Sequence, residues 1–172
     1  MIPQRHIADA FDLGGRVLEV QPLGRGLIND TYLVTTDAPT GRHAVLQRIN
    51  RRAFPQPELI MQNLRVLSDH VRTRSRSNDR PLRLPQILTA RDGKDFTLDA
   101  EGGFWRALNY IENSATFETV TDLKQAEEVG AALGRFHALV SDLDPKRMHA
   151  TRPWFHDTPH YFARFADVAA RA

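Results

Sequence analysis

The period of the hydrophobic pattern changes along this chain, and the change restricts the folds that the chain can adopt. Residues 16–49 and 86–111 carry short, roughly alternating runs of apolar and β-branched side chains, which predicts strands. Residues 57–71 and 122–143 instead carry apolar side chains every three or four positions, which predicts amphipathic helices. This order favours an α+β fold in which a sheet part with one helix precedes a helical part.

Six runs are expected to form the sheet. Asp92-Gly93 separates two of the later runs, and a dipeptide of this kind between alternating segments is typical of a hairpin. We therefore expect an antiparallel sheet of five to six strands. The predicted strands are residues 16–23, 31–36, 43–49, 86–90, 95–98 and 104–111.

Four helices are expected around this sheet. A short one within residues 1–14 should end at Gly14-Gly15, a pair suited to a left-handed C-terminal cap. The helix over 57–71 has Pro57 at its first position. Asp122 and Gln125 approximate a capping box at the start of the long helix, which Asp144-Pro145 should end, and a last helix covers about 158–172.

These elements predict a division of the chain into parts. Residues 1–112 form the sheet part, residues 113–121 a linker, and residues 122–172 the start of a helical part. The long helix has a wide apolar face that needs a partner, and the sequence after it supplies one more helix. We therefore expect the helical part to be incomplete in this chain.

The composition excludes several classes of protein. The chain has no cysteine, which excludes disulfides, thiolate zinc sites and cysteine nucleophiles. No secretory signal or membrane-length apolar run is visible, so we expect a cytoplasmic protein with no membrane partner. A net charge of +2 does not demand a polyanion. The arginine-rich stretch 72–83 lacks aromatic residues, which favours a solvated loop over a nucleic-acid site.

The turn Gly24-Arg25-Gly26-Leu27-Ile28-Asn29 lies between two predicted strands. It is either a plain hairpin turn or a flap over phosphate groups, because glycines let backbone amides approach an anion closely. Asn29 can take a positive-φ conformation nearly as well as a third glycine. A dinucleotide-binding fold is disfavoured, since there the glycines open a helix.

Arg48 is the candidate cation on the third predicted strand. It could neutralise phosphate oxygens across the sheet from the glycine turn, or be an ordinary surface arginine. A carboxylate on the following helix could orient it. Glu58 is the acidic candidate and Gln62 lies at a plausible spacing too, although Glu58 could equally do no more than complement the helix dipole.

Taken together, these residues resemble the protein-kinase-like small lobe, and in detail the aminoglycoside phosphotransferase/choline kinase family. The closest likeness is to bacterial N-acetylhexosamine kinase-like phosphotransferases. The stretches that carry it are residues 22–34, 45–50, 59–63, 105–106, 110–114, 134–137 and 155–158.

The resemblance implies an ATP-dependent transfer of the γ-phosphoryl group to a hydroxyl of a small molecule. An N-acetylhexosamine or related amino sugar is the implied acceptor, which would place the protein in carbohydrate metabolism. Tyr110 to Asn113 would be the hinge whose backbone holds adenine. The implied ATP-binding residues are Gly24, Arg25, Gly26, Leu27, Ile28, Asn29, Thr31, Arg48, Glu58, Tyr110, Ile111 and Glu112.

The catalytic residues of this family are expected outside the chain. Phosphoryl transfer needs an acceptor-orienting carboxylate and ligands for Mg²⁺. Neither His156-Asp157 nor Asp142-Leu143-Asp144 has the matching pattern, so we expect no catalytic and no metal-binding residue here. Mg²⁺ ligands should lie beyond residue 172, the rest of the large lobe should be a partner, and this chain alone should not transfer phosphate. The alternatives are a non-catalytic kinase-like binding or regulatory protein and a basic nucleic-acid-binding module.

Overall fold

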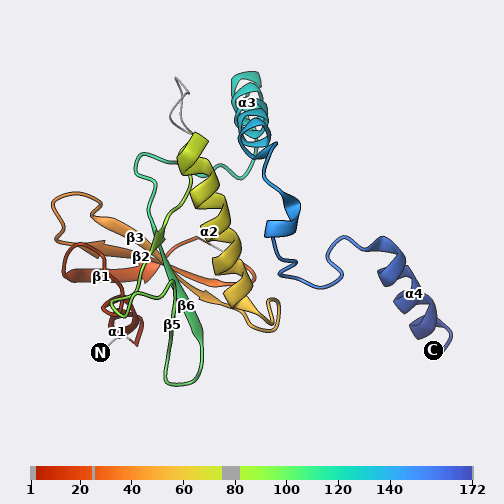
Figure 1. The fold of residues 1–172 in the computed structure, drawn as a ribbon, viewed down its shortest axis with the longest axis horizontal. Helices are drawn as coiled ribbons and strands as arrows, with labels where there is room; N and C mark the ends of the chain where they lie inside the picture. The colour runs from red at the N-terminus through yellow and green to blue at the C-terminus, as the bar shows by residue number, and fades with distance from the viewer. Residues whose placement is uncertain (1–2, 25, 75–81, 172) are drawn as a thin grey trace.

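A computed structural model describes residues 3–24, 26–74 and 82–171 of the chain. Its six strands form one antiparallel sheet in the order β1-β2-β3-β6-β4, with β5 also paired to β6 (Figure 1). This confirms the expected α+β fold with an antiparallel sheet. The elements are α1 (Pro3–Ala8), β1 (Val17–Pro22), β2 (Asp30–Thr36), β3 (His43–Ile49), α2 (Pro57–Arg74), β4 (Ile87–Leu88), β5 (Thr97–Leu98), β6 (Phe104–Asn109), α3 (Leu123–Val140), the 3-10 turn η2 (Pro145–Arg147) and α4 (Thr158–Ala169).

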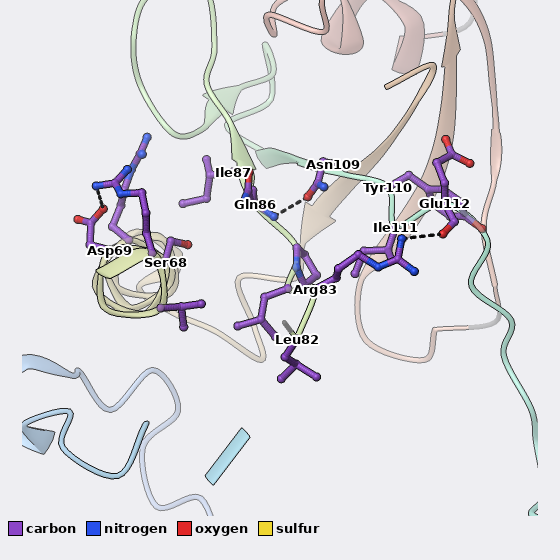
Figure 2. Close-up of a pocket in the computed structure, with 15 residues that line it drawn as sticks. Ser68, Asp69, Leu82, Arg83, Gln86, Ile87, Asn109, Tyr110, Ile111 and Glu112 are labelled. Atoms are coloured by element: carbon purple, nitrogen blue, oxygen red, sulfur yellow. Dashed lines mark hydrogen bonds and ion pairs between the residues drawn. The ribbon is translucent and has the colours of Figure 1, made fainter. Parts of the chain in front are cut away.

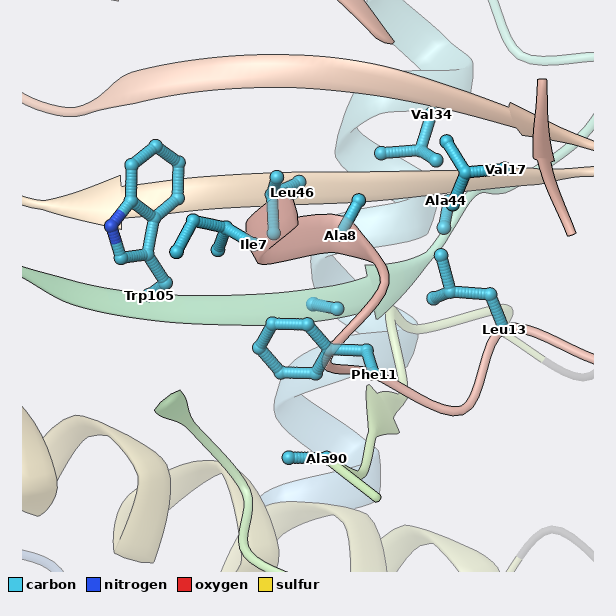
Figure 3. Close-up of a cluster of buried hydrophobic side chains, with 11 residues drawn as sticks. Ile7, Ala8, Phe11, Leu13, Val17, Val34, Ala44, Leu46, Ala90 and Trp105 are labelled. Carbon is cyan, nitrogen blue, oxygen red and sulfur yellow. The ribbon is translucent and has the colours of Figure 1, made fainter. Parts of the chain in front are cut away.

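One face of the sheet, which we call the α1 face, is covered by α1 and the residues that follow it. Alternate residues of β3 and β6, among them Leu46 and Trp105, contribute to a buried cluster with Phe11 (Figure 3). Phe11 is fully buried, as is Ala8 of α1. Because successive side chains of a strand point to opposite faces, the neighbours of these residues lie on the other face.

The opposite face, which we call the α2 face, packs against α2. Ile49 of β3 and Phe104 of β6 are directly opposite each other in the register and form a second cluster with Met61 of α2. The ring of Phe104 is fully buried and stacks on Phe96 with centroids 4.4 Å apart. The sheet therefore has an apolar layer on each side, and the two layers use alternate residues of the same strands.

The N-terminal helix is shorter than expected, and Gly14-Gly15 does not cap it. Helix α1 ends at Ala8, because residues 10–12 leave the helix to pair with the segment at 89–91. Asp12 N donates to Thr89 O at 2.9 Å, and Arg91 N donates to Ala10 O at 2.8 Å. Competition from this long-range pairing ends the helix.

Two of the later strands are also shorter than expected. Strands β4 and β5 contain two residues each, whereas the sequence predicts residues 86–90 and 95–98. Each pairs only with β6. The remaining strands and α2 lie within a few residues of their expected positions.

The helical part joins the sheet part through α2, which lies between the sheet and α3 (Figure 1). His70 of α2 binds the carbonyl of Leu139 at 3.0 Å and lies 3.1 Å from Asp142. Asn63 of α2 exchanges two hydrogen bonds of 2.8 Å with the backbone of His149. The α2 face of the sheet is therefore the face on the side of the helical part.

Helix α3 begins as the sequence predicts and ends earlier. Asp122 is its N-cap and accepts from Gln125 N at 2.8 Å. The Gln125 side chain returns to the amide of Thr121 instead of Asp122, so the capping box is displaced by one residue. The helix ends at Val140, before Asp144-Pro145. None of the described residues of α3 and α4 is buried, and none of the described helices is long and apolar enough to cross a membrane.

Candidate functional site

The glycine turn connects β1 to β2 at one end of the sheet. A hydrogen bond of 2.8 Å from Leu23 N to Thr31 O closes its base. Gly24 has φ +74°, a conformation that costs other residues energy, and a Cβ there would meet no atom within 4 Å. Leu27 at the tip is fully exposed. The turn therefore has open space at Gly24 and at Leu27, whereas a Cβ on Gly26 would meet the Asn29 carbonyl oxygen at 3.2 Å. Arg25 lies outside the described residues.

Asn29 has a different role from the expected one. Asn113, Trp154 and His156 are the described non-glycine residues with positive φ, so the prediction that Asn29 replaces a third glycine is wrong. Its side-chain oxygen instead accepts a hydrogen bond of 2.9 Å from Asn50 N, just after β3. This bond ties the end of the glycine turn to the end of β3.

Arg48 lies on the α1 face of the sheet. It is directly opposite Trp105 in the register, and its guanidinium carbon lies 5.9 Å from the centre of that indole ring. Its Nη2 lies 3.5 Å from Asp99 and 3.7 Å from Glu101, both in the β5–β6 turn. The partner of Arg48 is thus a pair of turn carboxylates.

The expected pairing of Arg48 with Glu58 or Gln62 is therefore wrong. Both candidates are on α2, which packs on the opposite face, and strand alternation turns Arg48 away from that helix. Glu58 instead accepts a hydrogen bond of 3.0 Å from Arg51. Gln62 lines a shallow cavity between α2 and the segment around Asp95.

The hinge residues border a cavity of about 650 Å³ (Figure 2). The cavity lies between the second half of α2, residues 82–87 and residues 109–112. This volume is within the range of small-molecule sites. Tyr110, Ile111 and Glu112 thus line one edge of this cavity.

Hydrogen bonds to His43 and Arg83 fix the hinge in place, but two of its backbone groups have no protein partner among the described residues. Tyr110 N donates to His43 O at 3.4 Å, and the Glu112 side chain lies 2.8 Å from His43 Nδ1. Arg83 donates to the Glu112 carbonyl at 3.4 Å. Within the described chain, neither the Tyr110 carbonyl nor the Glu112 amide has a protein partner. These two groups are available to a ligand.

A row of three polar side chains crosses the α2 face, and of these the sequence predicts only Thr31 as a site residue, whereas Gln47 and Arg106 were not predicted. Thr31, Gln47 and Arg106 are directly opposite one another on β2, β3 and β6. Gln47 Nε2 donates to the Thr31 hydroxyl at 2.9 Å, and Arg106 donates to Gln47 Oε1 from Nε at 3.1 Å and Nη2 at 2.7 Å. Gln47 lies two residues before Ile49 and Arg106 lies two residues after Phe104, and this spacing was the signal that could have placed both on this face.

The carboxylates of the helical part have structural roles. Asp144 caps η2 by accepting from Lys146 N at 2.9 Å, and Asp157 caps α4 by accepting from His160 N at 3.0 Å. Asp142 forms ion pairs with His70 and Arg74 of α2. Over residues 3–24, 26–74 and 82–171, no three acidic or histidine side chains are grouped as metal ligands.

An antiparallel sheet with a glycine turn, one packed helix and a hinge leading into helices defines the small-lobe half of a kinase-like phosphotransferase fold. Residues 19–172 match the phosphotransferase enzyme family (APH), and the chain belongs to that family. A solved structure described as the microcompartment-associated aminopropanol kinase has the same fold, with a TM-score of 0.61 and 19% identity. The match covers 92% of this chain and 47% of that one, so this chain spans about half the length of that kinase.

Proposed function

We propose that this chain forms the nucleotide-binding part of an ATP-dependent small-molecule kinase. Membership of the phosphotransferase family supports this proposal. The observation that carries it is the cavity of about 650 Å³ whose edge is the 109–112 segment. Residues 1–112 would bind the nucleotide, residues 113–121 would link the two parts, and residues 122–172 would begin the helical lobe.

Adenine would bind the free backbone groups of the hinge. The Tyr110 carbonyl can accept a hydrogen bond from the 6-amino group, and the Glu112 amide can donate to a ring nitrogen. Tyr110 directly follows β6 and Glu112 begins the next turn, so these two groups, which have no partner among the described residues, lie within three consecutive residues. The pair therefore offers one acceptor and one donor to the base.

The triphosphate would lie toward the glycine turn. Gly24 and Gly26 carry no side chain that keeps an anion away from the backbone, and the exposed turn can close over it. Mg²⁺ bound with ATP would neutralise the phosphate oxygens. Because Asp144 and Asp157 are used as helix caps, we propose that the Mg²⁺ ligands and the acceptor-orienting carboxylate lie outside this chain.

The acceptor would be the hydroxyl of a small molecule. The sequence resemblance favours an N-acetylhexosamine, and the likeness in fold to an aminopropanol kinase fits a small acceptor that carries both hydroxyl and amino groups. The chain itself would bind nucleotide without transferring phosphate.

Nucleotide titration of the purified chain tests the proposal. Isothermal titration calorimetry with Mg²⁺ and ATP should show saturable binding. Inosine triphosphate, which has an oxygen in place of the 6-amino group, should bind at least about tenfold more weakly, because the Tyr110 carbonyl would then face another acceptor. Absence of ATP binding would contradict the proposal. Equal affinity for both nucleotides would contradict the role of the hinge.

A further inference from the structure

Arg106 has an unusual environment for a cation inside a sheet. It extends from β6 across the α2 face, and its two described hydrogen bonds both end on the neutral amide oxygen of Gln47. Within the described residues, no carboxylate lies at ion-pair distance from it, and its Nη1 has no partner. The guanidinium thus keeps donor capacity and its full positive charge.

An uncompensated charge of this kind is unfavourable. Burial lowers the pKa of Arg106 below its ordinary value, and no neighbouring charge acts in the opposite direction. The group remains protonated at neutral pH because the pKa of arginine is so high. A half-buried cation without a counter-ion is unfavourable, and an anion bound beside it offsets that cost.

The position of Arg106 suits an anion held by the glycine turn. Arg106, Gln47 and Thr31 share one level of the register, and Thr31 follows the glycine turn by two residues. Tyr110 lies four residues further along the same chain, or about 13 Å in an extended strand. This separation is comparable with the length of an extended nucleoside triphosphate, so the base could reach the hinge while phosphate reaches Arg106.

Arg48 provides the contrast. It lies one residue after Gln47 and therefore on the other face, where Asp99 and Glu101 compensate its charge. A phosphate on the side of the helical part would not reach it without crossing the sheet.

We propose that Arg106, held in place by Gln47, is the phosphate-binding cation of the nucleotide site. The cation thus comes from the strand that leads into the hinge, whereas the sequence predicts it on β3. This inference rests on the proposed nucleotide-binding function. The recognised ligand is the phosphate chain of a nucleoside triphosphate.

Two substitutions with a matched control test this inference in calorimetric titrations of the chain with Mg²⁺-ATP and with adenosine. Arg106→Gln should weaken ATP binding about tenfold to a hundredfold, because a charge-assisted contact is lost, while changing adenosine binding less than about twofold. Arg48→Gln is the control on the opposite face and should leave both affinities unchanged. Arg106→Lys keeps the positive charge and should retain part of the ATP affinity that Arg106→Gln loses.

Gln47→Glu keeps the test decisive if Arg106→Gln fails to fold. It places a carboxylate against the guanidinium, so the fold should be retained while the cation is neutralised and ATP affinity falls about tenfold or more. If the folded variants among Arg106→Gln and Gln47→Glu bind ATP as tightly as the wild-type chain, Arg106 has only a structural role. The inference is then wrong, while the proposed nucleotide-binding function stands. If the wild-type chain binds no ATP, the proposed function fails and the inference fails with it.

Discussion

Asp99 lies in the β5–β6 turn, where its carboxylate accepts three hydrogen bonds. Oδ2 accepts from Trp105 Nε1 at 2.8 Å, and Oδ1 accepts from the amides of Gly103 at 2.6 Å and Glu101 at 3.0 Å. Arg48 Nη2 lies 3.5 Å from Oδ2. Asp99→Asn preserves one acceptor for the two amides. Its NH₂ group, which only donates, then faces the donors of Trp105 and Arg48.

The expected cost follows from these contacts. An unpaired, part-buried indole N–H costs about 1–3 kcal/mol. The lost attraction to Arg48 adds no more than about 1 kcal/mol, since that side chain is 39% exposed and solvent screens the pair. We therefore expect Asp99→Asn to lower the free energy of unfolding by about 1–4 kcal/mol at pH 7.

The same carboxylate predicts a pH dependence. Burial acts to raise the pKa of Asp99, but the hydrogen bonds from Trp105, Gly103 and Glu101 and the charge of Arg48 outweigh it, and the pKa is lowered. Such a group stabilises the fold above its unfolded pKa of about 3.9 and loses that contribution as the pH falls through the folded pKa. The difference between wild type and variant should be constant from about pH 5 to pH 8 and decrease below about pH 4.

Urea unfolding followed by far-UV circular dichroism across this pH range measures both effects. Asp92→Asn is the control, because Asp92 accepts a hydrogen bond from Lys94 N in a comparable turn while its side chain remains 53% exposed, and it should leave the midpoint unchanged. If Asp99→Asn unfolds at the same urea concentration as Asp92→Asn, the Asp99 network does not stabilise the fold. A stability difference that persists unchanged down to pH 3 would show that the ionised carboxylate is not its origin.

Three further substitutions have expected outcomes. Gly24→Ala should cost about 1–2 kcal/mol in urea unfolding because φ is +74° there, and it should also weaken ATP binding; unchanged stability would contradict the positive φ. Phe104→Ala should cost about 3–5 kcal/mol, since the ring is fully buried between β6 and α2, and a cost below about 1 kcal/mol would contradict that packing. Phe165→Ser should leave the unfolding midpoint unchanged and reduce self-association in analytical ultracentrifugation, because the ring is 68% exposed on α4; unchanged association would exclude this apolar surface as its cause.

Most of the sheet part could be predicted because its signals are local. Alternation of side chains identified the strands around Leu46 and Phe104, and Pro57 marked the first residue of α2. The start of α3 at Asp122 was equally local, since an N-cap depends on residues within one turn. The end of α1 could not be predicted, because the pairing of Asp12 with Thr89 joins segments far apart in the chain.

The sequence by itself determined the order of elements, the position of the glycine turn between β1 and β2, and the membership of a phosphotransferase family. These depend on local propensity and on motifs that neighbouring residues carry. Only the tertiary structure decided which face of the sheet packs against α2, and therefore which polar residues lie on that side. Arg48 and Arg106 are both arginines on adjacent strands, but a strand reverses its side chains at every residue, so Arg48 meets Asp99 while Arg106 meets Gln47. The packing of α2 then determined which of these two faces lies toward the helical part.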